Sequence, residues 1–242
     1  MTKTINPDRL TYEKARSWGY FFHRQTWHLL ALLVLVPGTW LLARPFLDGS
    51  RWLGWTDLTW FWLAIGLAVV HQVVVWIVFR LQIGWATLTR VFGRADLVIW
   101  GILFQTLLTG RIAAIIGLGQ TTQNTLPVPR TLALILAFIL LLSFAYLIWS
   151  VFKYFGLVRA MVGDHFRIKY RQMPLEDRGI FKYSSNAMYT FGFLVLWAIG
   201  LIQLSVPALL LAAFNHIYIW VHYFCTEKPD MVLIFGDEMD QI

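Results

Sequence analysis

The sequence has few charged residues and a single cysteine, and each shortage excludes a class of protein. Charged side chains make up 14% of the 242 residues, compared with about 25% in soluble domains, which excludes an ordinary soluble enzyme. With only Cys225, the chain cannot form an intramolecular disulfide, and it has too few thiolates for a cysteine-based zinc or iron–sulfur site. The six histidines are scattered along the chain, so no metal site is expected.

The short motifs of soluble nucleotide-binding and hydrolytic enzymes are missing as well. The sequence contains no GxGxxG after a strand, no P-loop, no HExxH and no GxSxG nucleophile elbow. The formal net charge is +7, but the basic residues border apolar runs. We therefore expect no nucleic-acid partner.

Long apolar runs account for most of the chain, in which 58% of residues are hydrophobic. A bilayer core about 30 Å thick requires about 20 mostly apolar residues per helix. We therefore predict an all-α integral membrane protein with about six transmembrane helices, the last two forming a short helical hairpin. The predicted spans are Trp27–Phe46, Leu58–Phe79, Ala95–Leu118, Leu132–Phe155, Ala187–Gln203 and Pro207–Phe224.

The distribution of basic residues predicts the orientation, because short cytoplasmic segments carry the excess of Lys and Arg. With the N-terminus inside, 16 of the 20 Lys and Arg residues are cytoplasmic, and the other four are Arg44, Arg51, Arg111 and Arg130. Both termini are thus expected in the cytoplasm, in a bacterial inner membrane or a eukaryotic endomembrane.

Two segments differ from the predicted spans and from plain loops. Leu81–Arg94 mixes apolar and polar residues, which is typical of a short amphipathic helix in the membrane interface. Val162–Ser185 is the longest polar stretch between spans, and connections of this length are usually functional or disordered.

A polar stripe runs along the last predicted span. Asn215, Tyr218, His222 and Thr226 are spaced so that they share one face of a helix, and that face should contact protein, water or a ligand rather than lipid. For Asn215 and Tyr218, hydrogen bonds to neighbouring helices are an equal alternative. An ionisable residue within a membrane marks a functional site by default, so His222 is the main candidate.

The other histidines are weaker candidates. His28 and His71 each stand alone near or within a span, where a packing role is favoured. His216 is offset by about 100° from the polar stripe. His165 lies in a predicted loop, where a histidine is more often solvated.

Three short elements near the C-terminus resemble motifs of one enzyme family. They are Gly163–Phe166 (Gly-Asp-His-Phe), Asn186–Tyr189 (Asn-Ala-Met-Tyr) and Glu227–Pro229 (Glu-Lys-Pro). In this order, around a helical hairpin, they are similar to elements of the integral-membrane methyltransferases that use S-adenosylmethionine. Phosphatidylethanolamine N-methyltransferases are the nearer resemblance, and isoprenylcysteine carboxyl methyltransferases the more distant one.

The resemblance covers Gly163–Asp240, about the last third of the chain, and it departs from the family pattern twice. Ala187 replaces a proline, which is a mild change at a helix start. Lys228 replaces a second glutamate, which reverses a charge beside the implied cofactor. We expect one membrane domain over residues 1–242. Its first part, residues 1–158, contains four spans, and its second part, residues 159–242, contains the implied cofactor-binding loop, the helical hairpin and the tail.

The resemblance implies methyl transfer from S-adenosylmethionine to the amine of a phospholipid headgroup at the cytoplasmic face. The implied cofactor-binding residues are Gly163, Asp164, His165, Tyr183, Asn186, Met188, Tyr189, Glu227 and Lys228. An ethanolamine amine must first lose a proton, and His222 is the expected base, with Glu227 second. The expected substrate-binding residues are Asn215, Tyr218, Arg171, Arg178 and Lys182, although the basic ones could instead only set the topology.

Other functions remain open at this point. Within the same class, the acceptor could be an isoprenylcysteine carboxylate or a small thiol or amine. In other classes of protein, the chain could be a small transporter or channel subunit, or a structural protein. The sequence shows no inverted repeat and no matching pair of broken spans, which are typical of transporters. The number of methyl groups transferred and the oligomeric state are not predicted.

Overall fold

The computed structural model describes residues 6–236, and within them the chain is almost entirely helical. Five helices are long and apolar enough to cross a membrane: Trp18–Phe46, Asp57–Trp85, Thr87–Thr121, Arg130–Phe155 and Val206–Phe235. Ala187–Ile202 is a shorter apolar helix. The prediction of an all-α integral membrane protein is confirmed, and the shorter helix corresponds to the fifth predicted span.

Twelve α-helices are described within residues 6–236, several of which join end to end. They are α1 (Trp18–Phe21), α2 (Gln25–Ala43), α3 (Asp57–Trp85), α4 (Thr87–Phe92), α5 (Asp96–Thr121), α6 (Arg130–Ser150), α7 (Leu157–Ala160), α8 (Ile168–Arg171), α9 (Ala187–Gly192), α10 (Leu194–Ile202), α11 (Val206–His222) and α12 (Lys228–Phe235). Two-residue strands β1 (Arg51–Trp52) and β2 (Trp55–Thr56) pair antiparallel between α2 and α3.

Short 3-10 and π segments complete the described elements. The 3-10 turns are η1 (Pro7–Leu10), η2 (Glu13–Ala15), η3 (Arg44–Phe46), η4 (Gly93–Ala95), η6 (Gly163–His165) and η7 (Gly179–Lys182). The π-helical segments are η5 (Val151–Phe155) and η8 (Tyr223–Glu227). The second of these links α11 to α12.

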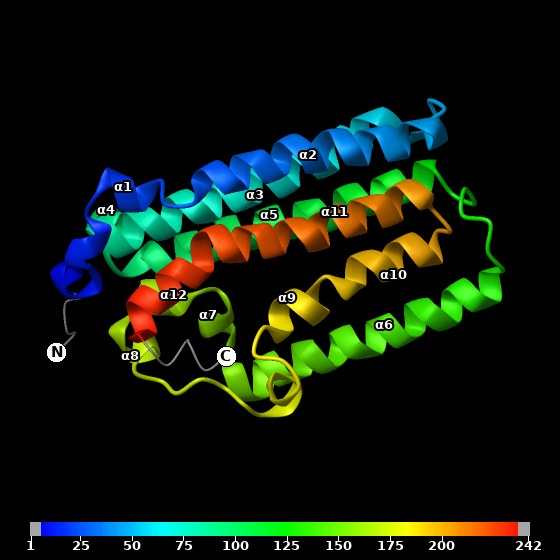
Figure 1. Ribbon diagram of the computed structural model, residues 1–242. Coiled ribbons are helices and arrows are strands. Elements are labelled where there is room, and N and C mark those ends of the chain that lie inside the picture. Colours follow the sequence, from blue (N-terminus) through cyan, green and yellow to red (C-terminus); the bar gives the residue numbers. More distant parts are fainter. Residues whose placement is uncertain (1–5, 237–242) are drawn as a thin grey trace.

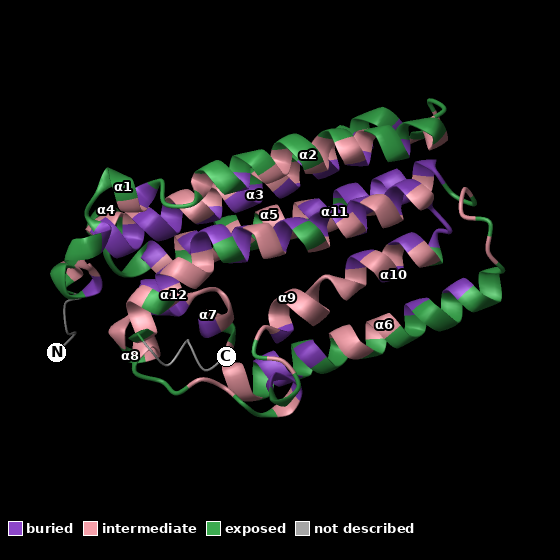
Figure 2. Cartoon of the chain, viewed as in Figure 1, coloured by how far each residue is buried: buried purple, intermediate pink, exposed green. Residues whose placement is uncertain are grey.

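The long helices form one elongated bundle (Figure 1), in which α3 packs against α5, α11 against α2, and α10 against both α11 and α6. In the most apolar windows, 56% of residues in Val206–Phe235 are buried, compared with 11% in Trp18–Phe46 and 17% in Arg130–Phe155. The helix containing α11 is therefore central, and α2 and α6 expose long outer faces (Figure 2), as expected for helices that contact lipid.

Small residues and local caps explain how the central helices form. Ala64, Ala114 and Ala212 are almost fully buried in the core shared by α3, α5 and α11, and small side chains allow helix backbones to approach closely. Helix α11 begins after Ser205, whose side chain accepts a hydrogen bond from the backbone N–H of Ala208. This N-cap ends the tight turn from α10.

Three predicted features of the chain path differ in the structure. The last span does not end at Phe224, because η8 continues α11 into α12 as far as Phe235. Leu81–Arg94 is not one interfacial helix, because α3 extends to Trp85 and the chain turns at Ala86, whose backbone is left-handed, before α4. The fifth span is also broken, since α9 ends at Gly192 and α10 begins at Leu194.

Both ends of the described chain lie at the same end of the bundle (Figure 1), where η1 and α12 are found. Six helical crossings, the fifth of them short, return the chain to its starting side. This end also carries the loop between α6 and α9, which contains η6, α8 and η7. The residues at 237–240, the last of the resemblance, lie outside the described part of the chain.

Candidate functional site

The three elements that resemble family motifs converge at this end of the bundle, around the π-helical turn η8. The hydroxyl of Tyr189, in α9, donates a hydrogen bond to Oε2 of Glu227, the last residue of η8. On the other side, Nε2 of His165, in η6, lies 3.5 Å from Oδ2 of Asp230, in α12. The fold therefore brings together segments separated by up to 65 residues.

Glu227 lies at the boundary between the buried interior and the open end of the bundle. Its side chain is 14% exposed, and its Oε1 lies 3.5 Å from Nε2 of His222, which is fully buried. Neither ring nitrogen of His222 has a hydrogen-bond partner among the described residues. A partly exposed carboxylate beside an unsatisfied imidazole can accept a proton or bind a cationic or hydroxyl group of a ligand.

A π-helical turn leaves backbone carbonyl groups without their usual helical partners, and side chains from the first part of the chain bind those of η8. Arg24 donates to the carbonyl of Phe224 at 3.1 Å, and Gln25 donates to the carbonyl of Cys225 at 3.3 Å. Gln25 also donates to Oγ1 of Thr226 at 3.2 Å.

Two further side chains complete this set. Arg80, in α3, donates to the carbonyl groups of Cys225 and Thr226 at 3.4 and 3.5 Å, and the hydroxyl oxygen of Tyr20, in α1, lies 3.2 Å from the carbonyl oxygen of Pro229. We call Tyr20, Arg24, Gln25 and Arg80 the η8 clamp. These four residues fix the backbone that carries Glu227.

A buried ion network lies directly behind the η8 clamp. Arg80 and Asp230 form an ion pair of 2.8 Å with both side chains fully buried, and Tyr20 donates to Oδ1 of Asp230 at 3.0 Å. Asp230 contacts His165, whose Nδ1 lies 2.9 Å from Oδ1 of Asp164. With His165 protonated, two cations face two carboxylates, so the buried charges balance.

His165 differs from an ordinary solvated loop histidine. Its burial by itself lowers the pKa, but the carboxylates of Asp164 and Asp230 outweigh burial and raise the pKa of His165 to about 9. The imidazole is therefore charged near neutral pH. Gly163 begins this turn where a Cβ would lie 2.8 Å from the carbonyl oxygen of Val158, so a larger residue would not fit.

The polar stripe of the last span faces protein, as predicted. Asn215, Tyr218, His222 and Thr226 are all fully buried. Oδ1 of Asn215 accepts hydrogen bonds from Arg111 at 2.6 and 3.0 Å, and the hydroxyl of Tyr218 lies 2.7 Å from Nε2 of His28. These pairs tie α11 to α5 and α2, so the helix-packing alternative for Asn215 and Tyr218 has direct contacts to support it.

The basic residues expected at the lipid phosphate are placed differently from one another. Arg171 donates to the carbonyl groups of Asp164 at 2.6 Å and Leu10 at 2.9 Å, which ties the loop to the N-terminal segment. Arg178 is paired with Glu176 at 2.7 Å, and Lys182 is exposed. Only the last two present their charge near the surface.

The remaining predicted cofactor residues lie around α9. Asn186 precedes α9, and Met188 and Tyr189 are half-buried within it, while Lys228 is half-buried in the first turn of α12. Tyr183 is 73% exposed, so it lies apart from the buried side of the site. The roles of all these residues stay predictions.

Sequence reasoning missed the two buried arginines. Arg80 was counted only as a cytoplasmic flanking charge, and Arg111 only as a charge on the opposite side. Arg111 is instead 2% exposed and lies 3.0 Å from Nδ1 of His71. A charged residue inside an apolar span was the available signal for Arg111, whereas Arg80 lies near a span end, where charges are common.

Comparison with protein-family models finds one family that matches the C-terminal part of the chain, which contains Glu227. Residues 132–238 match the family model described as phospholipid methyltransferase. This region, which is somewhat less than half of the chain, is similar to that family. The match includes α6 and all three motif elements, so the resemblance to phospholipid methyltransferases is confirmed and begins earlier than predicted. No curated protein and no solved structure matches the chain.

Proposed function

We propose that this protein transfers a methyl group from S-adenosylmethionine to the amine of a phospholipid headgroup, phosphatidylethanolamine or its partly methylated forms. The observation that carries the proposal is the convergence of the three family-like elements at Glu227, through Tyr189 on one side and the network of Asp230 and His165 on the other. The family match over residues 132–238 supports the reaction class.

The residues around Glu227 fit a polar cofactor. Glu227 is a partly exposed carboxylate that can bind an ammonium group or ribose hydroxyls, and the hydroxyl of Tyr189 adds a polar atom beside it. Asn186 directly precedes the helix that carries Tyr189. Met188 offers an apolar contact on the same helix. When bound, S-adenosylmethionine would supply an electrophilic methyl group on a sulfonium.

The protein's own contribution is then alignment and proton removal. Orientation of the reacting groups can lower a barrier by about 7–11 kcal/mol, and the η8 clamp fixes the turn that carries Glu227. A headgroup amine must lose its proton before it can accept a methyl group. His222, with an unsatisfied ring 3.5 Å from Glu227, is the base we propose, and Glu227 is the second candidate.

We also propose that this end of the bundle faces the cytoplasm, with both termini on that side. In Figure 1, η1 and α12 lie at the same end of the bundle, which supports the placement of both termini on one side of the membrane. The excess of basic residues at this end supports the cytoplasmic side. The substrate would then enter sideways from the adjacent lipid leaflet. Lys182, which is exposed in η7, is a candidate contact for the lipid phosphate.

Two measurements test the proposed function. Labelled S-adenosylmethionine should bind the detergent-solubilised full chain, and lipid mass spectrometry of cells that produce the protein should show new methylated ethanolamine lipids. Cells that produce Glu227→Ala at the same level are the matched control. Cofactor binding without methylated lipids would redirect the activity to a carboxylate, thiol or small amine, and absence of cofactor binding would contradict methyl transfer altogether.

A further inference from the structure

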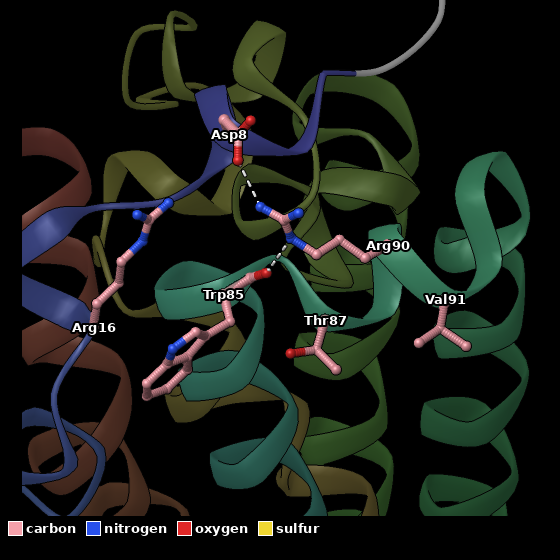
Figure 3. Close-up of a pocket in the computed structure, with 6 residues that line it drawn as sticks. All are labelled: Asp8, Arg16, Trp85, Thr87, Arg90 and Val91. Carbon is pink, nitrogen blue, oxygen red and sulfur yellow. Dashed lines mark hydrogen bonds and ion pairs between the residues drawn. The ribbon is translucent and has the colours of Figure 1, made fainter.

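A surface pocket of about 580 Å³ lies where the N-terminal segment meets the corner between α3 and α4. Figure 3 shows its lining side chains, with Arg16 and Arg90 on opposite sides of Trp85 and Thr87 and with Asp8 beside Arg90. None of these residues belongs to the candidate site at Glu227. The pocket therefore needs its own explanation.

The two arginines are fixed by the C-terminal end of α3. Nε of Arg16 donates to the carbonyl of Gly84 at 3.2 Å, and Nε of Arg90 donates to the carbonyl of Trp85 at 2.9 Å. These carbonyl groups belong to the last turn of a helix, which has no helical donors for them. Nη2 of Arg16 donates to Thr11 and Nη2 of Arg90 donates to Asp8, so Nη1 of each guanidinium group is left without a hydrogen bond to a described residue and can serve the pocket.

The N-terminal segment that carries Arg16 is tightly attached to α3. The backbone N–H of Tyr12 donates to the carbonyl of Ile83 at 2.9 Å, and a Cβ at Gly84 would lie only 2.8 Å from the carbonyl oxygen of Ala15. Arg16 also donates to the hydroxyl of Thr11 at 2.7 Å. One wall of the pocket is therefore preorganised.

The pocket lies at the depth of lipid headgroups. Helix α3 has 29 residues and a length of about 43 Å at 1.5 Å per residue, which exceeds the hydrocarbon core of about 30 Å. The helix must then project beyond the hydrocarbon core, and we infer that its end at Trp85 reaches the headgroup layer. The ring of Trp85 lies 6.0 Å from that of Trp18, which is 68% exposed, and such aromatic residues are typical of membrane interfaces.

The charges around the pocket match a phosphate. Arginine binds phosphate through paired N–H groups, and two arginines face this space. At present Asp8 contacts Arg90 at 2.5 Å, in a pair whose side chains are 69% and 49% exposed. Because exposed ion pairs contribute little net stability, an incoming anion could replace Asp8 at small cost.

We propose that this pocket binds the phosphate of a membrane phospholipid headgroup between Arg16 and Arg90, in exchange for Asp8. The lipid bound here is distinct from the one at Glu227, and its binding does not depend on methyl transfer. The competing explanation is that both arginines only cap α3 and the pocket holds solvent.

Native mass spectrometry of the full chain in detergent, titrated with phosphatidylglycerol, tests the proposal. Arg16→Gln combined with Arg90→Gln should weaken one lipid adduct at least tenfold. The matched control is Arg44→Gln combined with Arg51→Gln, which removes two exposed arginines at the opposite end of the bundle and should leave that adduct unchanged. Diacylglycerol, which lacks the phosphate, should not form the adduct.

A second variant keeps the test decisive if the double variant does not fold. Asp8→Asn removes the competing carboxylate while both arginines stay in place, so it should tighten phosphatidylglycerol binding severalfold. Equal binding by the wild type, the double variant and Asp8→Asn would overturn the proposal. Displacement of the lipid by inorganic phosphate at equal concentration would also overturn it, in favour of a site for free anions.

Discussion

The family-matched region and the helices before it contribute differently to the site. Residues 132–238 carry the motif elements and Glu227, whereas all four residues of the η8 clamp lie before residue 132. The unmatched helices thus fix the backbone from which the family-like carboxylate projects. A family motif can therefore be local in sequence while its geometry depends on residues that have no family signature.

Along α11, too, residues of the family-matched region are held by side chains from the helices before residue 132. Asn215 is bound by Arg111 of α5, Tyr218 by His28 of α2, and Thr226 by Gln25 of α2. Only His222 lacks such a partner among the described residues. The stripe residue without a hydrogen-bond partner is the one we propose as the base, and this contrast is what the following predictions test.

The largest expected effect is on turnover after His222→Gln. If His222 removes a proton from the acceptor amine, turnover should fall about 10²–10⁴-fold, with little change in cofactor affinity. The matched control is His216→Gln on the same helix, whose Nδ1 accepts a hydrogen bond from Trp197 at 3.2 Å and which should retain turnover. Near-normal turnover of His222→Gln with intact binding would favour an acceptor that is already anionic, such as a carboxylate or thiolate.

The next largest effect should come from Arg80→Met, which tests the contribution of the unmatched helices. This change leaves the fully buried carboxylate of Asp230 without its arginine, and loss of one partner of a buried pair costs about 3–5 kcal/mol. Thermal unfolding in detergent measures the loss. Arg80→Met combined with Asp230→Leu should recover part of the stability.

The cofactor readout distinguishes a clamp from a general structural anchor. Cofactor affinity of Arg80→Met, measured below its unfolding temperature, should be lower than that of the wild type. An unchanged affinity in the folded variant would show that the η8 backbone is set by the matched region alone.

A smaller effect is expected from Glu227→Ala. Loss of a hydrogen bond from a charged group to the cofactor should weaken S-adenosylmethionine binding by about 1.5–3 kcal/mol. Glu13→Ala is the matched control, since Glu13 is an exposed glutamate in η2 at the same end of the bundle. Equal affinities of Glu227→Ala and the wild type would place the cofactor elsewhere.

The smallest effect should be a pH dependence of stability that comes from His165. Its folded-state pKa is raised to about 9 from an unfolded value of about 6.5, so its stabilising contribution is complete below pH 6.5 and is lost as the pH rises through 9. The melting temperature should fall between pH 7 and pH 9.5, by about 2–4 °C for each kcal/mol lost. In His165→Gln this fall should be reduced, and an equal fall in both proteins would contradict the assignment.

Local patterns in the sequence determined much of the fold and the motif positions. Hydropathy adds along the chain, so the apolar runs predicted the crossings, including the short fifth one, and helical spacing predicted the buried face of Asn215, Tyr218 and His222. Gly163–Phe166, Asn186–Tyr189 and Glu227–Pro229 together predicted the family that residues 132–238 match. Each of these inferences required only neighbouring residues on one helix or loop.

The tertiary structure alone decided how the site is held together. Lys228 and Pro229 resemble the exit from a span, yet the helix continues. Proline is accepted in the first turn of α12, and Arg24, Gln25 and Arg80 bind the carbonyl groups of η8. Arg80 and Asp230 are 150 residues apart, and each looks like an ordinary charge at the end of a span. Their pairing depends on which helices become neighbours in the bundle, and no local pattern of apolar and polar residues contains that information.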